Sequence, residues 1–316
     1  MRIRVLDMFC GAGGSSAGAR LAGAEIVRGI DAWDLATVTF KDNFANAVVE
    51  TRELGPFSRP AADMREGEID LLLASPECTN HSPAKGSRRR SEKSRQTSHY
   101  VATFAKMLWP RWIVLENVVQ LRDWRGYASL TKELKKLGYH MRPQVLNAAD
   151  FGVPQTRRRL FVICDRDREP ESVKPRSRKR RPAESVIDLE GGWPSRPLYA
   201  EGRAQATIER AERAMASLGK RAPFLIVYYG SDGAGGWQSL DRPLRTLTTL
   251  DRFGLVTWDG REPMLRMLQV DELRRAMGFP NTHSFDYGTR RDRIKLLGNG
   301  VAPPVMKAIV ETLAHP

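Results

Sequence analysis

Residues 3–31 read IRVLDMFCGAGGSSAGARLAGAEIVRGID, and this segment contains in turn the patterns of a strand, a tight turn, a helix and a second strand. Ile3 to Phe9 is a short apolar run of the kind that forms a buried strand. Residues 10–14 are rich in glycine and predict a tight turn. Ser15 can then cap a helix that extends to about Leu21. The segment therefore begins as a strand, a glycine turn and a helix.

A second strand is predicted over Ala24 to Ile30, and an acid, Asp31, stands at its end. This acid follows Gly11 by about 20 residues, the spacing of dinucleotide-binding units. Glycines let the backbone approach a ligand closely, and the acid can accept hydrogen bonds from both ribose hydroxyls. The unit therefore predicts a nucleotide-like cofactor.

The chain continues in the alternating style of a doubly wound α/β sheet. Apolar runs predict further strands, and apolar positions at helical spacing predict helices between them. The strands are expected over Asp70–Ala74, Trp112–Leu115 and Leu160–Cys164, and the helices over Tyr100–Leu108 and Ser129–Leu137.

The composition changes after Cys164, which indicates a second domain. Residues 174–182 form a basic run broken by prolines, typical of a linker. A helix over Ala206–Leu218 and a strand over Phe224–Tyr229 follow. A last helix, Val305–Leu313, has an apolar face that can pack on the first domain. We expect a large domain from residues 1–165 plus 285–316 and a small one from residues 166–284.

The charge points to a class of partner. The 316 residues hold 51 Lys and Arg against 37 Asp and Glu, a formal net charge of +14. Such a surplus favours a polyanion through phosphate neutralisation and counterion release. A basic protein with no nucleic-acid role is the alternative on charge alone.

Other bulk features are simpler to interpret. No stretch approaches the roughly 20 apolar residues of a membrane span, and the N-terminus lacks the apolar core of a signal peptide. We therefore expect a cytoplasmic protein. We also expect it to be monomeric. The three cysteines are too few and too scattered for a disulfide framework or a zinc cluster, so no metal is expected.

Cys78 stands out among the cysteines. It lies in the segment SPECTN (75–80), directly after the predicted strand Asp70–Ala74. Ligands of open α/β sheets bind at the carboxyl ends of the strands. Positive charge nearby, here in residues 81–90, raises the share of nucleophilic thiolate. A small buried side chain is the alternative, and it suits Cys164 better, because Cys164 lies inside an apolar strand.

Two further motifs border predicted strands: one follows a strand and the other precedes one. Glu116 ends the strand Trp112–Leu115 and can act as a proton donor if burial raises its pKa; a loop or capping carboxylate is the alternative. Arg157 and Arg159 stand before the strand Leu160–Cys164, and their alternation would direct both to one side. The alternative for the arginines is a solvated charge run.

Taken together, these motifs resemble those of the DNA cytosine-5 methyltransferases, in the same order and over nearly the whole chain. The segments that carry the resemblance are FCGAGG (9–14), the Pro–Cys loop, ENV (116–118), QTRRR (155–159), RPLRTLT (242–248) and GNGVAPPV (298–305). The resemblance implies a Rossmann-like S-adenosylmethionine-dependent domain with a small target-recognition domain. It also implies duplex DNA as the partner, and restriction–modification as one biological setting.

The resemblance assigns roles to individual residues. Cys78 would add to cytosine C6, Glu116 would contact N3 and the exocyclic amine, and Arg157 and Arg159 would hold the base and its nucleotide. The residues implied for S-adenosylmethionine are Phe9, Gly11 and Gly13 in the glycine turn, Asp31 for the ribose, Trp33 and Asp63 for the adenine, and Asn299 and Val301 near the C-terminus.

The chain departs from the family pattern in one notable place, because Glu77 separates the proline from Cys78. This departure leaves open a catalytically silent DNA-binding regulator. An RNA (tRNA) cytosine-5 methyltransferase also stays open, because a related branch of the family shares these motifs. The basic segment 83–98 is interpreted as a lid over a flipped nucleotide.

Overall fold

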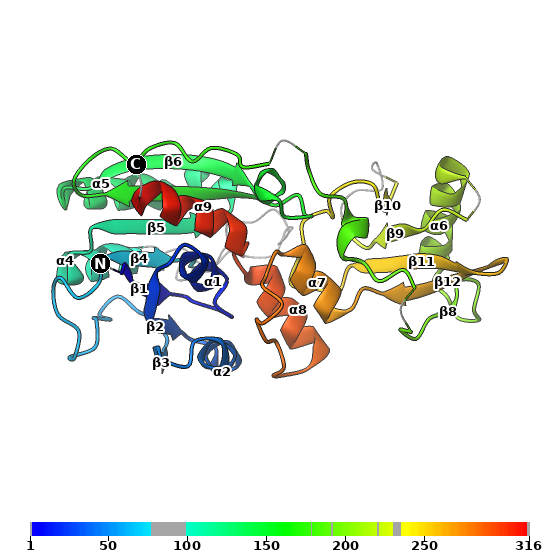
Figure 1. Ribbon diagram of the computed structural model, residues 1–316, viewed down its shortest axis with the longest axis horizontal. Helices are drawn as coiled ribbons and strands as arrows, with labels where there is room; N and C mark the ends of the chain where they lie inside the picture. The colour runs from blue at the N-terminus through cyan, green and yellow to red at the C-terminus, as the bar shows by residue number, and fades with distance from the viewer. Residues whose placement is uncertain are drawn as a thin grey trace.

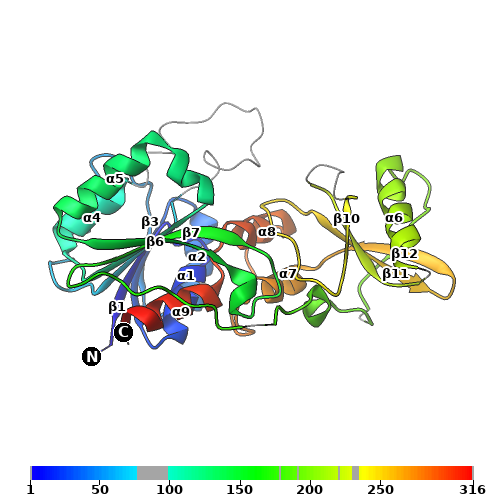
Figure 2. The ribbon, with the colours of Figure 1, turned by 90° about the horizontal axis from the view of Figure 1, so that it is seen from above.

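The computed structural model describes residues 2–76, 99–177, 179–190, 192–219, 221–229 and 235–314. Within these ranges two sheets lie at opposite ends of an elongated molecule, and helices α7 and α8 lie between them (Figures 1 and 2). The larger sheet has the strand order β3-β2-β1-β4-β5-β7-β6. Its strands are β1 (Arg4–Met8), β2 (Glu25–Asp31), β3 (Val48–Thr51), β4 (Leu71–Ala74), β5 (Trp112–Asn117), β6 (His140–Asn147) and β7 (Arg158–Asp165).

The first five strands in this order run parallel, whereas β7 pairs antiparallel with both β5 and β6. The reversal follows from a short connection. A single 3-10 turn, η4 (Ala148–Phe151), and a few further residues separate β6 from β7. Parallel strands need a crossover of a dozen residues or more, so these two must run antiparallel. The predicted α/β class is confirmed.

Helices cover both faces of this sheet. Helices α1 (Gly14–Leu21), α2 (Asp34–Asn43) and α9 (Pro303–Ala314) pack on one face, and α4 (His99–Leu108) and α5 (Arg125–Lys136) pack on the other. Strand β1 shows why. Val5 belongs to the core on the first face and Leu6 to the core on the second. A strand buried on both faces is rich in apolar residues, and β1 fits this except for its buried Asp7.

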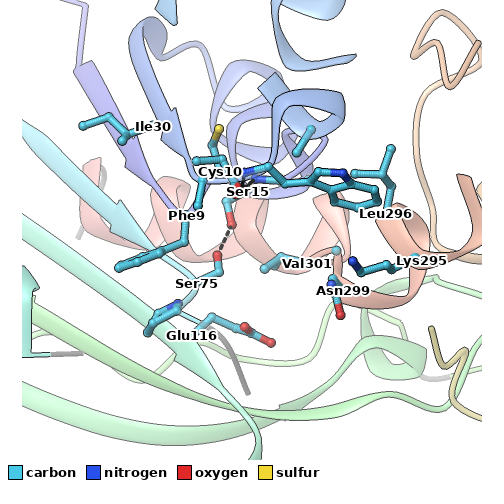
Figure 3. Close-up of a pocket in the computed structure, with 18 of the residues that line it drawn as sticks. Phe9, Cys10, Ser15, Ile30, Ser75, Glu116, Lys295, Leu296, Asn299 and Val301 are labelled. Carbon is cyan, nitrogen blue, oxygen red and sulfur yellow. Dashed lines mark hydrogen bonds between the residues drawn. The ribbon is translucent and has the colours of Figure 1, made fainter. Parts of the chain in front are cut away.

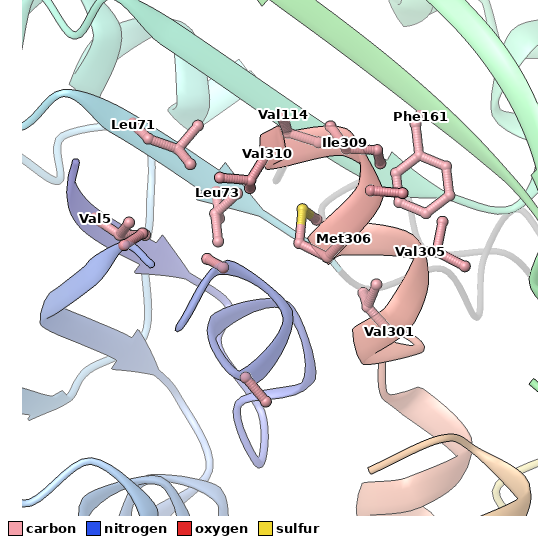
Figure 4. Close-up of a cluster of buried hydrophobic side chains, with 14 of the residues drawn as sticks. Val5, Leu71, Leu73, Val114, Phe161, Val301, Val305, Met306, Ile309 and Val310 are labelled. Atoms are coloured by element: carbon pink, nitrogen blue, oxygen red, sulfur yellow. The ribbon is translucent and has the colours of Figure 1, made fainter. Parts of the chain in front are cut away.

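Helix α9 returns the C-terminus to the first face of the sheet, as predicted. Its Met306, Ile309 and Val310 lie over Leu73 and Val114 of the sheet (Figure 4). Gly18 of α1 makes this packing close, since a Cβ atom there would lie 2.4 Å from the backbone oxygen of Pro303. The first and last helices of the chain are therefore in intimate contact.

The smaller sheet is antiparallel, with the order β10-β9-β11-β12-β8. Its strands are β8 (Arg196–Pro197), β9 (Phe224–Val227), β10 (Trp237–Ser239), β11 (Phe253–Asp259) and β12 (Glu262–Met267), and helix α6 (Gln205–Leu218) packs on it. All of these lie inside the range predicted for the small domain. The domain boundaries themselves stay a prediction.

Helices α7 (Val270–Ala276) and α8 (Arg290–Asn299) share a core with the smaller sheet and with Ala12 and Ala36 of the larger domain. Short 3-10 turns complete the structure: η3 (Val119–Asp123) and η5 (Ala183–Val186). In the part of the chain that the structure describes, no helix is both long and apolar enough to cross a membrane.

Candidate active site

A cavity of about 670 Å³ lies where β1, β2, β4 and β5 end, and the junction of α8 with α9 closes it (Figure 3). Its lining comes from segments far apart in the sequence. The residues that line it include Phe9, Cys10, Gly11, Gly14, Asp31, Trp33, Arg52, Glu53, Leu54, Ser75, Pro76, Tyr100, Glu116, Arg157, Arg159, Lys295, Asn299 and Val301. This is the strand edge at which the sequence predicts a ligand.

The glycine turn and Asp31 form one side of the cavity. Asp31 ends β2, and its two carboxylate oxygens accept hydrogen bonds from the backbone N–H groups of Gly11 and Trp33, each at 2.9 Å. Burial raises the pKa of Asp31, while these N–H groups and the charge of Lys295 lower it. A Cβ atom on Gly11 would meet nothing within 4 Å, so the backbone borders open space there.

Glu116 and Arg159 form the opposite side. Glu116 is buried at the end of β5, and Oε1 lies 3.2 Å from Nε of Arg159 on the neighbouring strand β7. Burial raises the pKa of Glu116, and the charges of Arg159 and Arg157 partly offset this. A carboxyl with a raised pKa keeps a protonated fraction and can donate to an acceptor in the cavity.

Arg157 is also buried and joins three parts of the chain. Its guanidinium donates to the carbonyl oxygens of Leu247 at 3.1 Å, Gly298 at 2.8 Å and Gly300 at 2.9 Å. Arg157 and Arg159 both line the cavity, which confirms that they share a side.

Cys78 and Glu77 lie outside the described residues, as does the segment 83–98. The described chain reaches the cavity at Ser75 and Pro76, and the side-chain amide of Asn117 donates to the carbonyl of Pro76 at 3.0 Å. Of the other cysteines, Cys164 is buried in β7 and burial raises its thiol pKa, as expected for a structural side chain.

The chain is similar to known proteins over nearly its whole length. A family model described as C-5 cytosine-specific DNA methylase matches residues 3–315. The chain belongs to this methylase family. It is similar to the type II methyltransferase M.HgiDI of Herpetosiphon aurantiacus, with 31% identity over 167 residues that make up 52% of each chain. The chain thus spans about half the length of several curated relatives that it matches.

Other similarities cover the full length of this methylase-family chain. The type II methyltransferase M.FnuDI of Fusobacterium nucleatum is 24% identical over 340 residues, covering 98% of this chain and 95% of that protein. The S. pombe Dnmt2 methyltransferase structure superposes with a TM-score of 0.69 at 17% identity, covering 100% and 99% of the two chains. The fold is therefore the Rossmann-like fold of the S-adenosylmethionine-dependent methyltransferases.

The methylase cavity brings together most of the residues singled out from the sequence. Those that line it are Phe9, Gly11, Asp31, Trp33, Glu116, Arg157, Arg159, Asn299 and Val301. Lys295, not expected from the sequence, lies with its ammonium 4.1 Å from the centre of the Trp33 ring. The roles of all these residues stay predictions.

Among the residues that the structure describes, two that were singled out from the sequence, Gly13 and Asp63, are not in the lining. The Cβ position of Gly13 would lie 2.4 Å from the Phe44 ring, so this glycine permits packing rather than ligand approach. Asp63 pairs with Arg28 of β2. Glu53 and Leu54 line the cavity instead, directly beyond β3. Sequence reasoning missed them because it missed β3; an acid after a third strand was the available signal.

Proposed function

We propose that this chain is a DNA (cytosine-5) methyltransferase that uses S-adenosylmethionine and forms a covalent bond between Cys78 and C6 of a flipped-out cytosine. The observation that supports this best is that one cavity joins Asp31 and the glycine turn to a buried Glu116–Arg159 pair. The family to which the chain belongs supports the same chemistry.

The cavity residues fit the cofactor. Each oxygen of Asp31 takes one N–H and keeps lone-pair capacity for a ribose hydroxyl. The open backbone at Gly11 allows the close approach that a nucleoside needs. Asn299 and Val301 border the cavity from the α8–α9 junction. When bound, S-adenosylmethionine supplies an electrophilic methyl group.

The base side of the cavity supplies the activation that cytosine needs. C5 of cytosine is a poor nucleophile until the Cys78 thiolate adds at C6 and pushes electron density toward C5 and N3. Glu116, with its raised pKa, donates to N3 and stabilises this adduct, and Arg159 holds the carboxyl in place. C5 would then be methylated with release of S-adenosylhomocysteine, and loss of the C5 proton to solvent water would expel the Cys78 thiolate and restore the ring.

The substrate is duplex DNA, and its target cytosine must leave the helix to reach this site. C5 and C6 of a stacked cytosine are not accessible to a thiol and a methyl donor at once, so the base must leave the helix. The net charge of +14 favours the phosphate backbone. The type II methyltransferase names of the relatives support DNA methylation in a restriction–modification setting.

A methyl-transfer assay tests the proposal. Purified protein with radiolabelled S-adenosylmethionine is incubated with duplex DNA or with tRNA, and bisulfite sequencing locates any 5-methylcytosine. Label in DNA at C5 is the expected result. Label in tRNA alone would favour the RNA methyltransferase, and no label in either would favour the silent regulator.

A further inference from the structure

We propose that His283 is a positioning residue for the cofactor, because it holds the peptide between Ala12 and Gly13 in the orientation that turns the glycine turn toward the ligand. This inference rests on the proposed function, in which that turn binds S-adenosylmethionine. His283 lies 271 residues after Ala12 in the chain.

The Ala12–Gly13 peptide is held at both of its polar atoms. Nε2 of His283 lies 2.7 Å from the carbonyl oxygen of Ala12, and the N–H of Gly13 donates to the carbonyl of Cys10 at 2.8 Å. Cys10, Gly11 and Gly14 line the cavity, whereas Ala12 does not. The Ala12 carbonyl is therefore bonded on the side of the turn away from the ligand.

The residues on either side of Ala12 do not by themselves fix the orientation of this peptide. Gly11 and Gly13 flank Ala12 with φ of 53° and 84°. Glycine adopts either sign of φ at similar cost, so neither residue by itself fixes this peptide. A carbonyl left buried without a donor is unfavourable, which favours rotation of the peptide toward a polar environment. The donor at His283 removes that incentive.

His283 is itself held rigidly. Its side chain is 2% exposed, and the rings of Phe44, Phe279 and Phe285 surround it with centroids 6.0, 4.7 and 5.3 Å away. Its neighbour Ser284 exchanges two backbone hydrogen bonds with the side chain of Asn43, at 2.8 and 3.0 Å. The ring therefore cannot follow a moving turn.

The protonation state of the ring agrees with a fixed donor. Burial lowers the pKa of His283 to about 4, so the imidazole is neutral at pH 7 and carries one N–H. Because a carbonyl oxygen only accepts, that hydrogen must be on Nε2. Nδ1 is buried and has no hydrogen-bond partner among the described residues. The single donor of this ring is thus committed to the Ala12 carbonyl.

The experiment measures the affinity of the purified full chain for S-adenosylhomocysteine by titration calorimetry, without DNA. His283→Leu keeps an apolar side chain of similar size but removes the donor, and its Kd should rise about tenfold. His283→Gln places an amide N–H near the same point and should recover most of the affinity. Ser284→Ala is the matched control, since the hydrogen bonds of Ser284 Oγ to described residues all go to Asp286, and its Kd should match the wild type.

A second measurement does not depend on the folding of any variant. Nitrogen-15 NMR of the wild-type chain, which has five histidines, reports which ring nitrogen carries the proton. Protonation of Nε2 alone is expected for His283 at pH 7. A proton on Nδ1 alone, or on both nitrogens, would overturn the inference.

The outcomes separate this inference from the function on which it rests. Wild-type binding together with an unchanged Kd in His283→Leu would overturn the positioning role and leave the proposed function standing. Failure of the wild-type chain to bind S-adenosylhomocysteine would contradict both.

Discussion

At the scale of single residues, two acids and an arginine from three strands of the larger sheet line the cavity. Glu116, Arg159 and Asp31 could be singled out because polar residues beside apolar strands gather at one sheet edge. Asp63 was implied for the adenine only by the family resemblance. The structure pairs Asp63 with Arg28, and Glu53, which follows β3, lines the cavity instead.

This difference gives a direct comparison of two acids. Glu53 stands beyond β3, whose Thr51 pairs with Asp31, and lines the cavity, so under the proposed function it is the acid available to the amino group of the cofactor's adenine. Glu53→Gln should raise the Kd for S-adenosylhomocysteine about tenfold, since a charged acceptor for the adenine amine is lost. Asp63→Asn should leave the Kd near that of the wild type. The reverse pattern in titration calorimetry would return the adenine contact to Asp63.

Asp7 carries a prediction about stability and pH. It is fully buried in β1 and accepts a hydrogen bond from Ser16 at 2.6 Å. Burial raises its pKa from 3.8 to about 7, and Ser16 opposes this. The folded chain therefore keeps a proton that the unfolded chain releases, so this carboxyl makes stability fall as pH rises from about 4 to about 7.

Asp7→Asn should remove this loss. Relative to the wild type, the variant should gain free energy of unfolding as pH rises through that window, by on the order of a few kcal/mol at pH 8. Urea denaturation at pH 4.5, 6 and 8 measures the difference. Parallel pH profiles for the two proteins would show that Asp7 does not titrate in this range.

At the scale of elements, strands with apolar runs could be predicted from the sequence. Elements with few apolar residues or without apolar periodicity were missed. β1, β4, β5 and β7 are buried strands with apolar runs, and each was expected within a few residues. β6 was missed because it is a half-exposed edge strand that contains Pro143. α8 was missed because its sequence, RRDRIKLLGN, has little apolar periodicity, and its buried residues pack between two domains.

The contact between α1 and α9 can be tested through Gly18. A Cβ atom there would lie 2.4 Å from the Pro303 oxygen, and a backbone atom cannot move aside cheaply. Gly18→Ala should therefore lower the free energy of unfolding by about 1–3 kcal/mol, despite the better helix propensity of alanine.

Gly55→Ala is the matched control for this helix contact, because a Cβ atom at Gly55 would meet nothing within 4 Å and its φ is not positive. Urea denaturation should show no loss of stability for it. A Gly18→Ala variant as stable as this control would mean that the two helices are not in close contact.

At the scale of the whole molecule, the chain closes on itself around the cavity. Val301 meets Gly14, whose Cβ position would lie 2.3 Å from the Val301 oxygen, so the last tenth of the chain completes a site begun by the first. Nothing in the spacing of the motifs predicts this contact; it was expected from the family resemblance. The antiparallel small sheet was hardly predictable either, since only β9 and α6 have clear patterns of their own.

Under the proposed function, Cys78 bonds covalently to C6 of a flipped cytosine at this cavity. Duplex DNA with 5-fluorocytosine at the target position tests it, because fluorine at C5 cannot leave as a proton does and the adduct persists. In the presence of S-adenosylmethionine, the wild-type chain should form a complex that survives denaturing electrophoresis, and peptide mass spectrometry should place it on Cys78. An absent adduct despite methylation of ordinary DNA, or a Cys78→Ser variant that still methylates DNA, would contradict the account.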